Sequence, residues 1–136
     1  MTDAHPHDIE EDLYREIILD HYREPRNVGR IEDAAIRRKE MNSSCGDAVE
    51  MFVALAKDGT VAKATFVGRG CALSQASASL LTEKLKGMPL DAVRRLSQDD
   101  ILKLLGVQVG TTRIRCALLP LKTLMQAIAD RDASTV

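Results

Sequence analysis

Three cysteines and one aspartate are the residues of this sequence best suited to bind a metal ion or to carry sulfur. Cys45, Cys71 and Cys116 are the only cysteines among 136 residues, and Asp47 lies two positions after the first. Three thiolates and a carboxylate can form a tetrahedral zinc site, and thiolates also hold iron–sulfur clusters. A carboxylate ligand would leave a cluster more labile than four cysteines would. We therefore treat the four side chains as one candidate site.

Each cysteine lies where the sequence predicts the end of a helix or strand. Cys45 is in a polar turn before the strongest strand pattern, Cys71 lies at a strand-to-helix junction, and Cys116 is near the start of the last helix. A thiol at a helix N-terminus meets the partial positive charge of unpaired N–H groups, which favours the thiolate. Arg69, two residues before Cys71, adds to that field. The thiolate is both the metal ligand and the sulfur nucleophile.

Spacing alone leaves other interpretations open. The sequence has no C-x-x-C pair, and the gaps between cysteines match no generic zinc finger. Free cysteine is also common as a small buried core residue. The odd, widely separated set argues against a secreted disulfide framework.

The elements that must position these residues follow from periodicity. Helical spacing of apolar residues predicts a first helix over 8–23, which Pro25 ends. Alternation predicts strands over 36–41, 49–55 and 61–67, the last two joined by a turn at Asp58-Gly59. Four further helices are predicted, over residues 71–86, 91–96, 99–105 and 113–131. Ser97 is a candidate cap for the third of these, and Pro120 suggests that the last helix becomes regular only near Leu119.

These elements predict an α+β fold, with a three-stranded antiparallel sheet packed against about four to five helices. The length suits one compact core, so we expect a single domain over residues 8–131, with flexible tails at 1–7 and 132–136.

Composition narrows the class of protein. The formal net charge is −1, without the strongly basic balance typical of a dedicated nucleic-acid binder. No apolar run approaches the length of a membrane span, and the polar N-terminus does not resemble a secretory signal. We expect a cytoplasmic protein that binds neither nucleic acid nor membrane.

Five short strings carry a resemblance to a known family. They are LYREIILDHY at 13–22, PRNVG at 25–29, NSSCGD at 42–47, GRGCALSQASAS at 68–79 and RIRCA at 113–117. In this order, and over nearly the whole chain, they resemble the U-type iron–sulfur cluster assembly scaffolds, the family of IscU, SufU and the N-terminal domain of NifU.

The resemblance implies a scaffold and sulfur acceptor rather than a classical enzyme. It would receive persulfide sulfur from a cysteine desulfurase, together with iron, and deliver clusters to recipient or carrier proteins. Cys45, Asp47, Cys71 and Cys116 would be the metal and cluster ligands, and the three cysteines the candidate persulfide acceptors. The site would hold zinc or a [2Fe-2S] cluster, or a [4Fe-4S] cluster on a dimer.

The sequence differs from the IscU branch of the family in one respect and from the SufU branch in another. IscU-type members carry a histidine directly before the last cysteine and a chaperone-binding motif ahead of it. This chain has Arg115 there and VGTTR at 109–113, which argues against a specialised Hsp70 partner. Its motifs are closer to SufU, yet the 71–116 interval lacks the SufU-type insertion. The alternatives are therefore a SufU-like zinc-dependent sulfurtransferase that activates the desulfurase without assembling clusters, and a zinc-stapled interaction domain with inert thiols.

The remaining ionisable groups have plainer interpretations. His21, in the last turn of the first helix, is expected to cap that helix end rather than bind metal. The basic run at 37–39 is expected to be the solvated face of an edge strand, a common protection against aggregation.

Overall fold

The fold is α+β, as predicted, and the described residues form one antiparallel sheet of three strands in the order β1-β2-β3 and five helices. The computed structural model describes residues 6–43 and 46–134. Along the chain the elements are α1 (Pro6–Arg23), β1 (Ile36–Asn42), β2 (Asp47–Leu55), β3 (Val61–Arg69), α2 (Ala72–Leu85), α3 (Leu90–Arg94), α4 (Gln98–Leu105) and α5 (Ile114–Ser134).

The sheet has the register that the sequence pattern requires. Asn42 pairs with Asp47 and Ile36 with Val53 between β1 and β2, and Ala48 pairs with Arg69 between β2 and β3. The predicted turn between β2 and β3 is confirmed, because Gly59 has a positive φ of 86° and donates its N–H to the Ala56 carbonyl at 3.0 Å.

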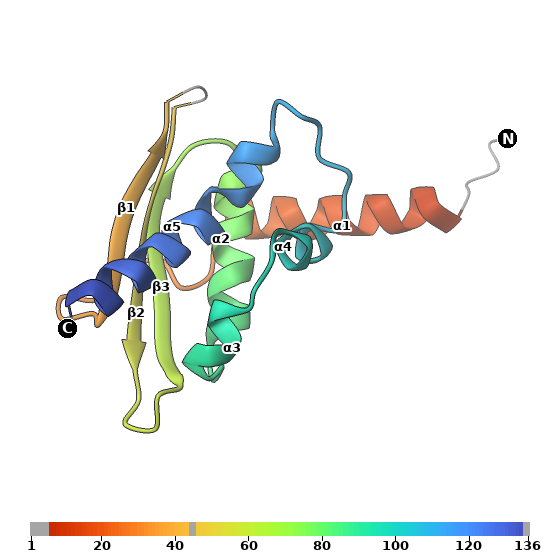
Figure 1. The fold of residues 1–136 in the computed structure, drawn as a ribbon. Helices are drawn as coiled ribbons and strands as arrows, with labels where there is room; N and C mark the ends of the chain where they lie inside the picture. Colours follow the sequence, from red (N-terminus) through yellow and green to blue (C-terminus); the bar gives the residue numbers. More distant parts are fainter. Residues whose placement is uncertain (1–5, 44–45, 135–136) are drawn as a thin grey trace, which may run out of the picture.

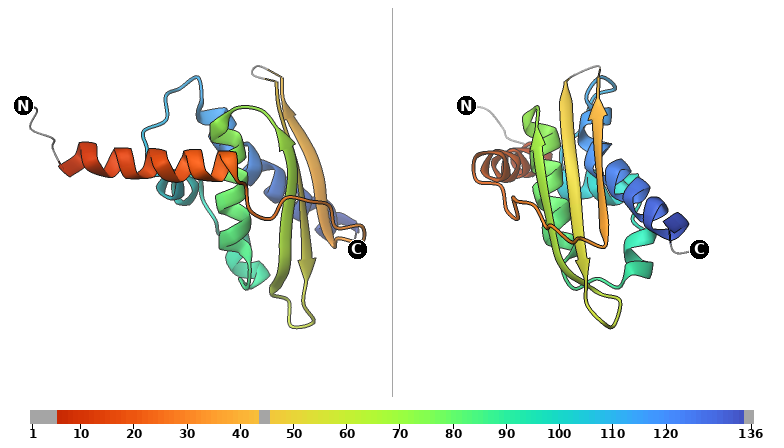
Figure 2. Two further views of the ribbon diagram at one scale, coloured as in Figure 1. Left: turned by 180° about the vertical axis from the view of Figure 1, so that it is seen from behind. Right: turned by 90° about the vertical axis from the view of Figure 1, so that its left-hand side faces the viewer.

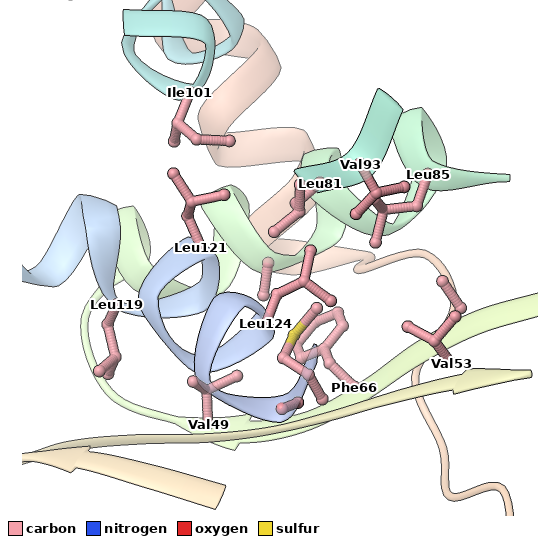
Figure 3. Close-up of a cluster of buried hydrophobic side chains, with 14 of the residues drawn as sticks. Val49, Val53, Phe66, Leu81, Leu85, Val93, Ile101, Leu119, Leu121 and Leu124 are labelled. Atoms are coloured by element: carbon pink, nitrogen blue, oxygen red, sulfur yellow. The ribbon is translucent and has the colours of Figure 1, made fainter. Parts of the chain in front are cut away.

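Helices α2 and α5 cover one face of the sheet, as Figure 1 shows. Figure 3 shows the core between these layers, where Leu81 of α2 and Leu124 of α5 lie with Phe66 of β3 in one cluster of fully buried side chains. The core consists mainly of Leu, Ile, Val and Ala, so α2 and α5 are held against the sheet by burial of aliphatic surface.

The opposite face of the sheet is covered by the connection between α1 and β1, which crosses it in Figure 2. Beneath it, Phe52 is fully buried, with the Arg30 and Arg37 guanidinium groups 5.8 and 5.2 Å from its ring centre. Both arginines also pair with Glu50, at 2.7 and 3.1 Å. The central strand is therefore buried on both faces. β1 is an edge strand, as expected, but Arg37 covers an aromatic ring as well as facing solvent.

The last helix starts within one residue of its predicted start, but it is regular earlier than Pro120 suggested. α5 is already helical at Ile114, and Pro120 lies inside it. Proline keeps a helical φ but cannot donate the N–H that would pair with the carbonyl of Cys116, four residues earlier. The helix continues through this position because burial of Leu119, Pro120 and Leu121 outweighs one missing hydrogen bond. Cys116 consequently lies in the first turn of a helix rather than in the preceding loop.

Helix α4 starts at the predicted cap. The Ser97 hydroxyl accepts a hydrogen bond from the Asp100 N–H, and the Asp100 carboxylate accepts one from the Ser97 N–H. This capping box satisfies two backbone donors that the helix itself cannot.

Helix α1 extends away from the sheet in Figure 1, and the C-terminal part of α1 contacts α2. The expectation that His21 caps this helix end is wrong. Its ring is buried, with Nδ1 at 2.6 Å from the Ser79 hydroxyl of α2 and Nε2 at 3.4 Å from the Glu83 carboxylate. Leu13 and Ile17 of the same helix stay exposed, so the apolar stripe of α1 is covered only in part.

The buried His21 predicts a loss of stability in mild acid. Burial, together with the nearby Arg26, lowers the pKa of His21 in the folded protein, against the opposing charges of Glu83 and Asp20. The unfolded chain then binds more protons than the folded one below about pH 6.5. The free energy of unfolding of the metal-free protein should therefore fall as the pH drops from 7 to 5, by at most about 1.4 kcal/mol per pH unit.

Urea unfolding of the metal-free protein at several pH values measures this dependence. His21→Gln should flatten it, whereas Glu83→Gln, which removes a charge that favours the imidazolium, should not. An unchanged slope in His21→Gln would assign the acid sensitivity to other groups.

Candidate metal centre

Three of the four predicted site residues come together at one end of the sheet. Asp47 is the first residue of β2, Cys71 directly precedes α2, and Cys116 is the third residue of α5. Each offers one ligand atom, and these atoms all lie within 4.8 Å of one another. In Figure 1 the start of β2, the start of α2 and the start of α5 gather at the same end of the molecule.

Asp47 is the innermost member of this cluster and is fully buried. One carboxylate oxygen, Oδ1, accepts a hydrogen bond from the Cys71 N–H at 2.9 Å, and Oδ2 lies 3.7 Å from the Cys71 sulfur. Zinc–sulfur and zinc–oxygen bonds of about 2.3 and 2.0 Å place tetrahedral ligand atoms about 3.5 to 3.8 Å apart. The Asp47 oxygen and the Cys71 sulfur already have this separation, so this pair of donors fits a zinc or iron ion.

Cys71 is the residue directly before α2 and is half-buried. Its backbone is extended, with φ −73° and ψ 167°, so that the helix begins only at Ala72. The Ser74 hydroxyl donates to the Cys71 carbonyl at 3.1 Å and lies 3.9 Å from the Cys71 sulfur. The predicted junction is confirmed, and Ser74 is a neighbour of the sulfur that periodicity did not single out.

Cys116 approaches from α5 and is buried, with 3% of its surface exposed. The Asn42 side-chain amide, at the end of β1, lies 4.0 Å from its sulfur. An amide N–H directed at sulfur stabilises a thiolate. Sequence reasoning did not assign Asn42 a role, although it begins the NSSCGD string that carries Cys45.

Cys45 lies outside the residues that the structure describes, so its place as fourth ligand stays a prediction. Asn42 and Asp47 are paired across the sheet, and each contacts one of the site thiols.

Gly70 is required for the close approach of Asp47 to Cys71. Its φ is 144°, and a Cβ at this position would lie within 3 Å of the Asp47 carboxylate, with the nearest oxygen far inside van der Waals contact. Any other residue would be strained and would also displace the carboxylate. This is the physical reason for a glycine directly before Cys71.

Gly70→Ala is therefore expected to weaken metal binding. We expect the zinc affinity to fall by about 10-fold or more, because a displaced ligand costs at least as much as a lost outer-shell contact. Competition with a chromophoric chelator measures it. Gly59→Ala is the matched control, since Gly59 also has a positive φ but nothing within 4 Å of its Cβ position. Equal affinity losses in the two variants would refute this role of Gly70.

The fold and the site together define a small α+β protein with a buried carboxylate and thiols at the end of a three-stranded sheet. Residues 13–135 match the family described as NifU-like N terminal domain. The chain belongs to this family, which confirms the resemblance in the sequence.

Relatives from both branches match most of the chain. The zinc-dependent sulfurtransferase SufU of Bacillus subtilis is 34% identical, over 88% of this chain and 92% of that protein. The iron–sulfur cluster assembly scaffold protein IscU of Escherichia coli K12 is 32% identical, over 86% of this chain and 92% of that protein.

Solved structures agree with the fold. A protein described as a candidate iron–sulfur cluster assembly scaffold for the SUF system of Fervidobacterium islandicum aligns with a TM-score of 0.68 and 26% identity, over 83% of this chain and 94% of that one. A NifU-like N-terminal protein of Brucella abortus aligns with a TM-score of 0.72 over 90% of this chain and 96% of that one. At 20% identity, that second likeness shows the fold alone.

Proposed function

We propose that this protein is a scaffold on which iron–sulfur clusters are assembled, with Cys45, Asp47, Cys71 and Cys116 as ligands. The observation that carries the proposal is the convergence of the Asp47, Cys71 and Cys116 ligand atoms within 4.8 Å. Family membership and relatives named as scaffolds support it. The bound species is zinc or a [2Fe-2S] cluster, or a [4Fe-4S] cluster shared by two copies.

The cysteines also accept sulfur in this proposal. A thiolate of the site attacks the outer sulfur of a persulfide on a cysteine desulfurase. A new sulfur–sulfur bond forms on this chain, and the desulfurase cysteine leaves as its thiolate. Reduction of that sulfur to the sulfide of a cluster takes two electrons, which an external thiol or protein reductant supplies. The chain itself then acts as acceptor and scaffold rather than as an enzyme.

The partners follow from this chemistry. They are a cysteine desulfurase and the recipient or carrier proteins that take the cluster, and we propose that they meet in the cytoplasm. No helix in the described part of the chain is long and apolar enough to cross a bilayer. We further propose that residues 8–131 act as a single domain.

A second function is favoured by one specific likeness. The SufU relative is named a zinc-dependent sulfurtransferase, and Arg115 stands where IscU-type members have histidine. In this alternative the site keeps a bound zinc ion. The protein then transfers sulfur and raises desulfurase turnover without building a cluster.

Anaerobic reconstitution distinguishes the two functions. The metal-free protein is mixed with ferrous iron, L-cysteine, dithiothreitol and a purified bacterial cysteine desulfurase. A scaffold should develop the visible absorption of a bound cluster that remains with the protein on gel filtration. Retained zinc with raised desulfurase turnover and no bound cluster would support the sulfurtransferase instead. If intact-mass measurement shows no added sulfur atom and no cluster forms, both proposals fail.

A further inference from the structure

A groove of about 720 Å³ runs along α5 beside the candidate metal centre. One wall is α5, the other is the connection between α3 and α4, and the end of β1 closes it. Its lining residues are Met41, Asn42, Ser43, Leu96, Ser97, Gln98, Ile114, Arg115, Leu118, Leu119, Leu121, Lys122 and Met125.

The floor of this α5 groove is apolar. Ile114, Leu118, Leu121 and Met125 follow one another at helical spacing and form a stripe about 16 Å long. Leu118 and Met125 are only partly buried against the core. At the groove's end Met41 is 57% exposed. Leu121 is buried, so the apolar surface that this groove leaves partly open to solvent comes from Ile114, Leu118, Met125 and Met41.

The charged residues that line the α5 groove are all positive. Arg115 and Lys122 are exposed and line it, and no Asp or Glu is among the described residues that do. Neither forms an ion pair within the described part of the chain. Two unpaired cations beside an apolar stripe complement a ligand that has both apolar and acidic groups.

The α5 groove ends at the metal centre. Asn42 lines it and also directs its amide toward the Cys116 sulfur at 4.0 Å. Arg115, the residue directly before Cys116, lines it as well. A segment bound here would place the protein that carries it next to the site thiols.

We propose that the α5 groove binds a short acidic, amphipathic segment of a partner protein, with the apolar side chains on the α5 stripe and the carboxylates near Arg115 and Lys122. The stripe has room for about three helical turns or about five extended residues. This goes beyond the proposed function, because binding in the groove requires neither a metal nor persulfide chemistry.

The test uses a fluorescein-labelled twelve-residue peptide with leucines at helical spacing and glutamates between them. Fluorescence anisotropy with the full chain, at low salt and with and without zinc, should show saturable binding that added salt weakens. A second peptide with lysine in place of every glutamate should bind at least about fivefold more weakly.

Matched protein variants locate the binding. Lys122→Glu reverses a charge in the groove and should raise the Kd about fivefold, and Leu118→Gln should weaken binding comparably. Lys57→Glu makes the same charge change in the exposed turn after β2, outside the groove, and should leave the Kd within about twofold.

Several outcomes would overturn the proposal. They are no preference for the acidic peptide and equal losses of affinity in Lys122→Glu and Lys57→Glu. A further one is peptide-induced changes in amide chemical shift at residues outside the α5 stripe instead of within it. Sedimentation showing a dimer that Leu118→Gln dissociates would assign the groove to a second copy instead. None of these readouts depends on cluster assembly, so this proposal and the proposed function can fail separately.

Discussion

Replacing any one of the three cysteines by serine is expected to abolish stable loading of metal or cluster. A serine hydroxyl does not ionise near neutral pH, so one strong ligand is lost from a site that has no surplus. Changes outside the ligand shell already cost about 10- to 100-fold in affinity, and loss of a thiolate should lower the zinc affinity by about 100-fold or more.

Chelator competition for zinc and visible absorption after reconstitution measure this for Cys45→Ser, Cys71→Ser and Cys116→Ser. Ser43→Ala is the matched control, because it removes an exposed hydroxyl two positions before Cys45 in the sequence and keeps every proposed ligand. Thermal unfolding in chelator checks that the variants fold. Wild-type zinc affinity in Cys45→Ser would remove that residue from the proposed ligand set.

The strands and most helices of this fold could be predicted because each has a local signal. Alternating apolar residues and the Asp58-Gly59 turn define the β2–β3 hairpin, and the Ser97 cap defines the start of α4. These features depend on residues close together in the chain. The regular part of α5 was expected to begin too late, near Leu119, because the cost of Pro120 within a helix is local, whereas the burial that compensates it depends on packing against β1 and α2.

Two other features of the fold could not be predicted because they depend on contacts between residues far apart in the chain. His21 lies in the last helical turn, as predicted, but its partner Ser79 is 58 residues away and no periodicity points to it. Burial of Phe52 on the outer face depends on Arg30, which belongs to a connection without regular structure.

The candidate site could be predicted in part. The sequence placed its thiols at ends of elements, and the structure agrees for Cys71 and Cys116. That these ends meet follows from the order of the strands and from the packing of α2 and α5 on one face. The contact of Asn42 with Cys116 likewise depends on this tertiary arrangement.

Replacing Asp47 by alanine should slow the release of a bound cluster rather than prevent its formation. A carboxylate is the weakest of the proposed ligands for iron in a thiolate site, and its dissociation admits an incoming thiol. Without it, a small-molecule thiolate from the reductant can complete a softer coordination shell. We expect the transfer of cluster to a chelator or an apo-ferredoxin to slow by about 10-fold.

Asp47 also accepts the Cys71 N–H, so alanine could act simply by loosening the start of α2. Asp47→Asn separates the two roles, because its amide oxygen can keep that hydrogen bond while the negative charge is lost. If the carboxylate makes the site labile, both variants should release cluster slowly, and only alanine should also lower the free energy of unfolding of the metal-free protein. Release at the wild-type rate in both variants would show that Asp47 holds Cys71 in place but does not control the lability of the cluster.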